Sequence, residues 1–233
     1  MHSLRIAGFV LALAVLIAIA YALYLFVPKI PELAVAPRGG AATSTETEMK
    51  VADVYGSTDA YHIEAHYPQF GIPAADAAIK AAVDTAIAEF KTYPQNPPDS
   101  STPQNQFTGS FNSAYVDPEY VSVALLFSVD TGGAHPNTTI TSVNIDRKTE
   151  KDVTLKDALS LIGKTLPQLA QGSLAQLKAN IGEDLIFPEG AAPKPGNYST
   201  FLISKDRVTF VFNSYQVAAY AAGPQNVWFA RVK

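Results

Sequence analysis

The feature of this sequence that most limits its possible folds is a run of 22 residues without a charged side chain, from Ile6 to Val27. An α-helix of that length rises about 33 Å, which is enough to cross the ~30 Å hydrocarbon layer of a bilayer. Tyr21 and Tyr24 lie near its far end, where amphipathic aromatic rings favour the membrane interface. We therefore predict an uncleaved single-pass anchor at residues 6–27, preceded by a short cytoplasmic tail of residues 1–5.

This anchor determines where the remainder of the chain is expected to work. The five residues before it are too few to fold, so we expect the folded part on the opposite side, outside the cytoplasm at the cell membrane. Residues 28–50 are rich in proline, glycine, alanine and threonine and show no periodicity, which predicts a flexible linker. Residues 51–233 are then the extracytoplasmic domain, with two sub-units at about residues 55–147 and 152–233.

Composition and charge exclude several classes of function. The chain has no cysteine, which excludes disulfide scaffolds, thiolate metal sites and cysteine nucleophiles. Residues 1–40 contain three basic side chains and one acidic side chain, so the remaining residues carry a net charge of −6 against −4 for the whole chain. Nucleic-acid binding needs clustered basic residues, so we expect no nucleic-acid partner. No phosphate-binding glycine motif is present, and we predict no cofactor.

The spacing of apolar residues predicts the main elements of the domain. Residues 61–67 alternate like a half-buried strand, and the apolar stripe from Ala75 to Phe90 predicts a helix, with Asp76 and Lys80 as an i,i+4 ion pair on its polar side. The nearly continuous apolar run at residues 120–130 predicts a central strand. Further strands are expected at residues 107–116, 138–146, 200–204, 207–215 and 226–232.

Two shorter helices have recognisable start signals. Thr154 to Asp157 and Thr165 to Gln168 both have the spacing of a capping box, in which the first and fourth residues satisfy each other's backbone N–H groups. Gly182 is placed to end the second of these helices. Together the elements predict an α+β fold, with a mostly antiparallel sheet and helices on one side of it.

Few residues carry the types and spacing that chemistry requires. His62 and Glu64 share one face of the first strand about 7 Å apart, so this pair is a weak candidate for holding a metal ion. The alternative is a solvated strand face. The motifs G-x-S-x-G, S-x-x-K and H-E-x-x-H do not occur, and we predict no catalytic residue.

A second group of residues suggests contact with a ligand. Paired glycines after an apolar strand bend the backbone sharply or let it approach another group closely. Polar side chains follow these glycines, and exposed tyrosines recur near the C-terminal end. The candidate ligand-contact residues are Gly132, Gly133, His135, Asn137, Tyr215 and Tyr220. The alternatives are a plain turn for the loop and ordinary core or rim packing for the tyrosines.

Four segments resemble, in order, an extracytoplasmic bacterial domain found in the anti-sigma factor RsiV and in the N-terminal half of the peptidoglycan deacetylase PdaC. Residues 210–225 resemble its closing pattern F-x-x-Y-x-V followed by a Y-A-x-G turn. Residues 132–137 are similar to its G-G-A-H loop, residues 154–159 to its T-L-x-D-L-F helix start, and residues 61–68 to its opening strand. The resemblance implies a domain outside the membrane, and in RsiV this domain binds lysozyme.

From these observations we expect a membrane-anchored binding or sensing module rather than an enzyme. Its expected partners are the membrane, through residues 6–27, and an envelope glycan or protein such as lysozyme. The alternative is an envelope hydrolase or metal-dependent enzyme that uses His135 or the pair of His62 and Glu64.

Overall fold

The computed structural model describes residues 48–96 and 103–232. In that part of the chain no helix is both long enough and apolar enough to span a bilayer. The predicted tail at residues 1–5, the predicted anchor at residues 6–27 and nearly all of the predicted linker lie outside the described residues.

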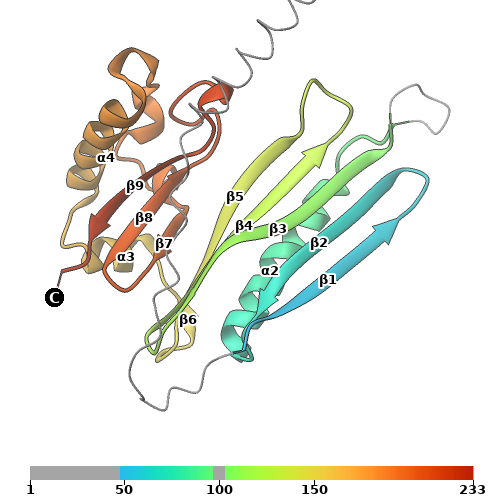
Figure 1. Ribbon diagram of the computed structural model, residues 1–233, viewed down its shortest axis with the longest axis horizontal. Helices are drawn as coiled ribbons and strands as arrows, with labels where there is room; N and C mark the ends of the chain where they lie inside the picture. Colours follow the sequence, from blue (N-terminus) through green and yellow to red (C-terminus); the bar gives the residue numbers. More distant parts are fainter. Residues whose placement is uncertain (1–47, 97–102, 233) are drawn as a thin grey trace, which may run out of the picture. The chain divides into compact units, whose positions relative to one another are not determined.

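The first half of the described chain forms a six-stranded sheet whose strands follow one another in sequence order (Figure 1). All neighbouring strands are antiparallel except β2 and β3, which run parallel. A parallel pair needs a long crossover connection, and the helix α2 (Pro73–Phe90) supplies it. The strands are β1 (Lys50–Ser57), β2 (Tyr61–Gln69), β3 (Asn105–Val116), β4 (Tyr120–Asp130), β5 (Asn137–Asp146) and β6 (Lys151–Asp152).

The helix α2 covers one face of this sheet with the stripe predicted from the sequence. Its buried residues recur at helical spacing and pack against the apolar side chains of β2 to β5. The predicted ion pair between Asp76 and Lys80 is wrong. Asp76 Oδ1 accepts the backbone N–H of Phe70 at 2.8 Å, and Lys80 pairs with Asp84 at 2.6 Å. A first-turn carboxylate has unpaired N–H groups close to it, so it serves the chain entering the helix instead.

The strand β4 lies in the middle of the sheet, as its apolar sequence predicts. Residues 121–125 are all buried. Val121, Val123 and Leu125 face α2, whereas Ala124 packs against the second sheet. Both faces of β4 are therefore covered, which explains why its sequence does not alternate between apolar and polar residues.

The second half of the chain forms two helices, a three-stranded antiparallel sheet and four short 3-10 helices (Figure 1). Both predicted capping boxes are present at the helix starts, and Gly182 (φ 91°) ends the second helix. Side chains from these helices and from one face of the small sheet make a separate core. The elements are α3 (Leu155–Leu161), α4 (Leu166–Ile181), η1 (Glu183–Leu185), η2 (Pro188–Ala191), η3 (Pro195–Tyr198), β7 (Phe201–Ile203), β8 (Arg207–Phe212), η4 (Tyr220–Ala222) and β9 (Gln225–Ala230).

The mixed α+β class is as predicted, but the strands form two sheets rather than one. Side chains of the large sheet hydrogen-bond the backbone of the edge strand β7. Ser122 Oγ accepts the N–H of Ile203 at 2.9 Å, and Ser142 Oγ accepts that of Phe201 at 3.0 Å. Asn144 Nδ2 donates to the carbonyl of Phe201 at 2.8 Å. The two sheets are thus joined through polar side chains instead of a shared strand ladder.

Candidate functional site

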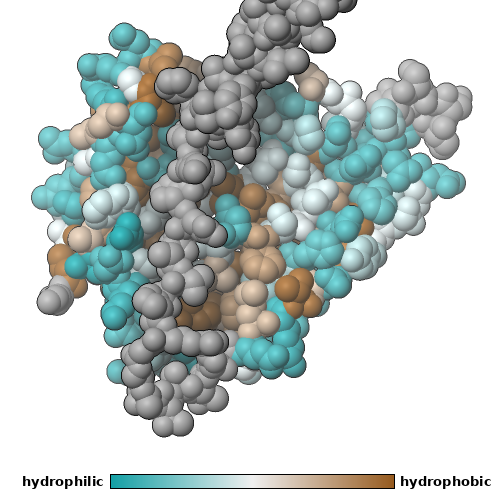
Figure 2. Space-filling view, viewed as in Figure 1, coloured by the Kyte–Doolittle hydropathy of each residue, from teal (hydrophilic) through white to brown (hydrophobic). Residues whose placement is uncertain are grey.

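Large apolar side chains are exposed at only a few places on the described part of the chain. Figure 2 shows one face, coloured mainly teal and white, on which hydrophobic residues occupy limited areas. The exposed large hydrophobic side chains are Met49, Val51, Tyr55, Tyr93, Leu185, Phe187, Tyr215, Tyr220, Trp228 and Val232. Two of them, Tyr215 and Tyr220, belong to the predicted ligand-contact group and lie together.

The loop between β4 and β5 meets the connection between β8 and β9 at one end of the domain. The imidazole of His135 stacks on the ring of Tyr220, with centroids 3.9 Å apart and planes 16° from parallel. The ring of Tyr215 lies 5.2 Å from Tyr220 and 6.4 Å from His135. The structure therefore brings together three of the predicted residues from positions 80 apart in sequence. We call His135, Tyr215 and Tyr220 the aromatic cluster.

Both ring nitrogens of His135 have a neighbour. Nδ1 lies 2.9 Å from the carbonyl oxygen of Pro136, which can only accept, so we place the proton of a neutral ring on Nδ1. Nε2 is then the acceptor for the hydroxyl of Tyr215, at a longer 3.4 Å. These contacts fix the direction of the ring and hold its face against Tyr220.

Tyr215 is held in a backbone conformation that side chains other than glycine rarely adopt. Its φ is +67°, in the left-handed region, although its side chain is 56% exposed and contributes little to the core. Such a conformation costs about 1–3 kcal/mol and persists only where the surroundings enforce it. The turn, and not the core, therefore holds this exposed ring in place.

Two amide side chains that the sequence analysis did not select hold this turn. Asn213 Oδ1 accepts the N–H of Ile140 at 2.6 Å, and its Nδ2 donates to the carbonyl of Ile140 at 3.1 Å. The backbone N–H of Asn213 donates to Gln216 Oε1 at 3.1 Å. Asn213 therefore fixes the turn that carries Tyr215 to the edge of β5.

Gln216 fixes the other side of the same turn. Its Nε2 donates to the carbonyls of Gly190 and Asn197, at 3.1 and 2.9 Å. Gly190 approaches so closely that an added Cβ would lie 1.7 Å from the backbone oxygen of Gln216. The sequence signal for this turn was the pair of amide side chains, Asn213 and Gln216, on either side of Tyr215. Amide side chains commonly hydrogen-bond the backbone of a turn.

The remaining loop candidates flank His135 in the same loop and do not belong to the stack of rings. Gly132 adopts φ +82°, and its N–H is accepted by Asp130 Oδ1 at 2.9 Å, so it shapes the turn. Gly133 contributes to the same exposed turn. Asn137 instead lines a groove of about 440 Å³ between α2 and β5.

The proposed metal pair is arranged differently from its sequence spacing. Glu64 Oε1 lies 3.1 Å from His66 Nε2, and Asp53 Oδ1 lies 2.7 Å from His66 Nδ1. Hydrogen bonding to Asp53, and then to Glu64, raises the pKa of His66. The two carboxylates approach opposite nitrogens of one ring, and no metal-binding group of three such residues occurs in residues 48–96 and 103–232. His62 does not take part in this arrangement.

Comparison with known proteins finds a family that the second half of the chain matches. Residues 151–231 match the family described as "Protein of unknown function (DUF3298)". This segment is thus similar to the DUF3298 family. Two solved DUF3298 family proteins share the fold. That from Bacteroides fragilis has a TM-score of 0.51 at 17% identity, covering 78% of this chain and 90% of its own. That from Pseudomonas aeruginosa has a TM-score of 0.52 at 15% identity, covering 78% and 91%.

The DUF3298 match confirms the predicted family resemblance, and two curated proteins extend it. The chain is 24% identical over 183 residues to the peptidoglycan-N-acetylmuramic acid deacetylase PdaC of Bacillus subtilis, covering 77% of this chain and 39% of PdaC. It is 28% identical over 138 residues to the immunogenic protein MPT64 of Mycobacterium tuberculosis, covering 57% and 60%. The chain thus spans about two fifths of the length of PdaC and three fifths of MPT64.

Proposed function

We propose that the described domain is a binding module and that the aromatic cluster is its contact surface. The observation that carries this proposal is the stack of His135 on Tyr220 beside a strained, exposed Tyr215. Tyrosine is enriched among the residues that dominate binding energy, because a rigid amphipathic ring offers large contact area at small entropic cost. A surface whose rings are already fixed loses less freedom when a ligand binds.

The contacts of His135 favour binding over catalysis. A general base must present a free nitrogen to the proton that it removes. Here Nδ1 faces a carbonyl and Nε2 faces the Tyr215 hydroxyl, while the ring face is covered by Tyr220. The imidazole is therefore positioned to contribute to the contact surface of the aromatic cluster.

The class of partner follows from charge and from the relatives. The residues after position 40 carry a net charge of −6, which would steer a basic protein toward the domain at a rate that falls with salt. The name of PdaC states that it acts on N-acetylmuramic acid of peptidoglycan. We infer a module held outside the cell membrane by residues 6–27 that takes an envelope glycan or a basic protein such as lysozyme.

Calorimetric titration of the full chain with lysozyme and with soluble peptidoglycan fragments, at low and moderate salt, tests this proposal. We expect saturable binding of one of them and a loss of roughly 30-fold in affinity for Tyr215→Ala or Tyr220→Ala. Tyr55→Ala is the matched control, because Tyr55 is another exposed tyrosine, on β1. Failure of both ligands to bind would refute the proposal, and turnover of the fragments would favour the enzymatic alternative.

A further inference from the structure

A second site is suggested by a hollow of about 700 Å³ between α3, the start of α4 and the 3-10 helix η3. This volume lies within the roughly 300–1,000 Å³ that is usual for sites that bind small molecules. The hollow is built entirely from the second half of the chain, and none of the residues of the aromatic cluster lines it. It is therefore separate from the binding surface proposed above.

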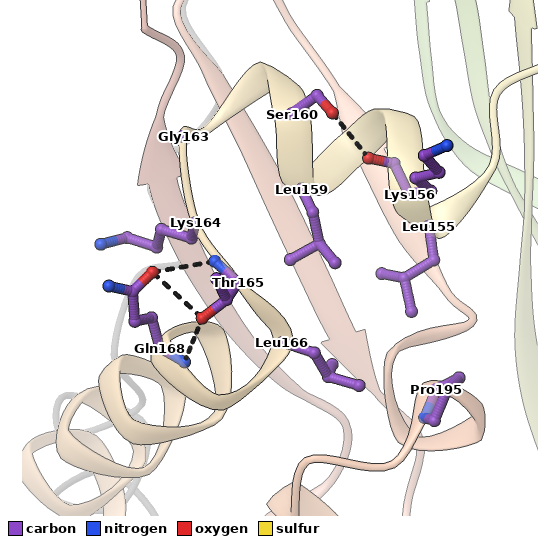
Figure 3. A pocket seen from close by; sticks show the side chains of 10 residues that line it. All are labelled: Leu155, Lys156, Leu159, Ser160, Gly163, Lys164, Thr165, Leu166, Gln168 and Pro195. Atoms are coloured by element: carbon purple, nitrogen blue, oxygen red, sulfur yellow. Dashed lines mark hydrogen bonds between the residues drawn. The ribbon is translucent and has the colours of Figure 1, made fainter.

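The walls of the hollow are mainly apolar. Figure 3 shows the side chains of Leu155, Leu159 and Leu166 directed toward a common space, with the ring of Pro195 at its far side. The three leucines are only half-buried, and they pack on the core of the small sheet. Apolar surface that remains accessible in this way gains free energy when an apolar group covers it.

The uncharged polar side chains of the lining are already engaged by their own helices. Ser160 Oγ donates to the carbonyl of Lys156 at 3.0 Å. Thr165 Oγ and Gln168 Oε1 belong to the capping box of α4. A ligand inside the hollow would meet few uncommitted hydrogen-bonding groups apart from two ammonium groups.

Those ammonium groups belong to Lys156 and Lys164, which lie on opposite sides of the rim and extend away from the apolar space (Figure 3). Neither forms an ion pair within 4.0 Å in the described part of the chain, although Lys164 Nζ lies 5.5 Å from the ring centroid of Phe229. The start of α4 adds the positive end of a helix dipole beside them. A rim of positive charge is unexpected on a domain with net charge −6, and it complements an anion.

We infer that this hollow binds a free single-chain amphiphile, with its alkyl chain on the three leucines and its anionic head group at the rim, in the positive field of Lys156 and Lys164. All lining residues lie in helices or in the turns that join them, so an extended peptide would find no strand edge to pair with. The chemistry of the walls and rim therefore favours a fatty-acid-like ligand over a peptide strand.

The test is a calorimetric titration of the full chain with dodecanoate below its micellar concentration. We expect saturable binding of one molecule. Dodecyltrimethylammonium has the same chain length and the opposite charge, and it should bind at least about ten-fold more weakly. Absence of saturable dodecanoate binding, or equal affinity for the two amphiphiles, would overturn the inference.

Variants locate the site. The pair Lys156→Glu and Lys164→Glu should weaken dodecanoate about ten-fold or more, whereas the pair Lys50→Glu and Lys148→Glu makes the same charge change elsewhere and should weaken it much less. Leu159→Asp should abolish binding. Leu159→Asp also disturbs packing. If that variant does not fold, the charge-reversed pair at Lys156 and Lys164 decides the test. Unchanged affinity in the Lys156 and Lys164 pair would refute this location. Lysozyme or glycan binding by the aromatic cluster should be unaffected by dodecanoate.

Discussion

Asn213 satisfies both backbone polar groups of Ile140, with its side-chain oxygen 2.6 Å from the N–H nitrogen and its side-chain nitrogen 3.1 Å from the carbonyl oxygen. A neighbouring strand makes the same two bonds to an edge residue. The amide therefore ends the exposed edge of β5 and, at the same time, fixes the turn that presents Tyr215. One residue connects the stability of the sheet edge with the geometry of the proposed contact surface.

Replacing Asn213 should therefore cost stability and affinity together. We expect Asn213→Ala to lower the free energy of unfolding by about 2–3 kcal/mol, because two hydrogen bonds are lost. The N–H of buried Ile140 is then left unpaired, and its carbonyl keeps only the longer 3.4 Å hydrogen bond from Thr200 Oγ1. Urea unfolding monitored by circular dichroism measures this change in the free energy of unfolding. Gln176 is the matched control, since it bridges the N–H and carbonyl of the exposed Trp228 in the same way. Gln176→Ala should cost less than about 1 kcal/mol, and equal costs would contradict the argument.

Two substitutions at Tyr215 separate its ring from its backbone. Tyr215→Ala removes the ring and keeps a side chain at φ +67°, whereas Tyr215→Gly also removes the strain. We expect the glycine variant to be more stable than the alanine variant by about 1 kcal/mol, and both to lose ligand affinity alike. Thermal unfolding and calorimetric titration of the pair provide the two measurements. A glycine variant that is less stable than the alanine variant would show that φ is not a source of strain here.

The close approach of Gly190 to Gln216 predicts a position that accepts only glycine. Gly190→Ala would place a Cβ 1.7 Å from a backbone oxygen, so the turn must move, and we expect a loss of about 3 kcal/mol. Gly196→Ala is the control, because an added Cβ there meets nothing within 4 Å. We expect that change to be neutral or slightly stabilising. Chemical unfolding compares them, and a tolerated Gly190→Ala would mean that Gln216 is less firmly held than the structure indicates.

The contacts of His66, which lies on β2 opposite β1, predict that the free energy of unfolding depends on pH. Because hydrogen bonds to Asp53 and Glu64 raise its folded pKa, the protonated ring is favoured in the folded state. Its stabilising contribution is complete below the unfolded pKa of about 6.5 and is lost as pH rises through the folded value. The NMR titration of the His66 ring should shift to lower pH in Asp53→Asn. The difference in unfolding free energy between wild type and His66→Gln should diminish over the same range, and a constant difference would exclude this contribution.

The sequence was most informative where a local rule decides the outcome. The capping boxes at Thr154 and Thr165 depend on four consecutive residues, and the central position of β4 follows from an unbroken apolar run. Strand β1 was not predicted because five of its eight residues are exposed and the other three are small. The parallel pairing of β2 with β3 depends on a crossover, which an alternating pattern alone does not reveal.

The candidate site was predictable only in its parts. His135, Tyr215 and Tyr220 could be selected one by one, but their stacking depends on how two distant loops meet. Glu64 was paired with His62 on spacing alone. In the structure His66 takes both Glu64 and Asp53, since register with a neighbouring strand brings Asp53 opposite it. Asn213 and Gln216 act through backbone groups that are remote in sequence, and no pattern of residue types specifies those partners.

The hydrogen bonds that hold β7 limit where this chain can be cut into fragments and which parts relatives can exchange. The family match begins at residue 151, yet Ser122, Ser142 and Asn144, which hold the backbone of β7, all precede it. A fragment cut at that limit would leave one flank of β7 without its partners and would expose Val211. The point where the family match starts is thus no natural place to cleave this protein, and exchange of either half between relatives must carry these three polar positions along.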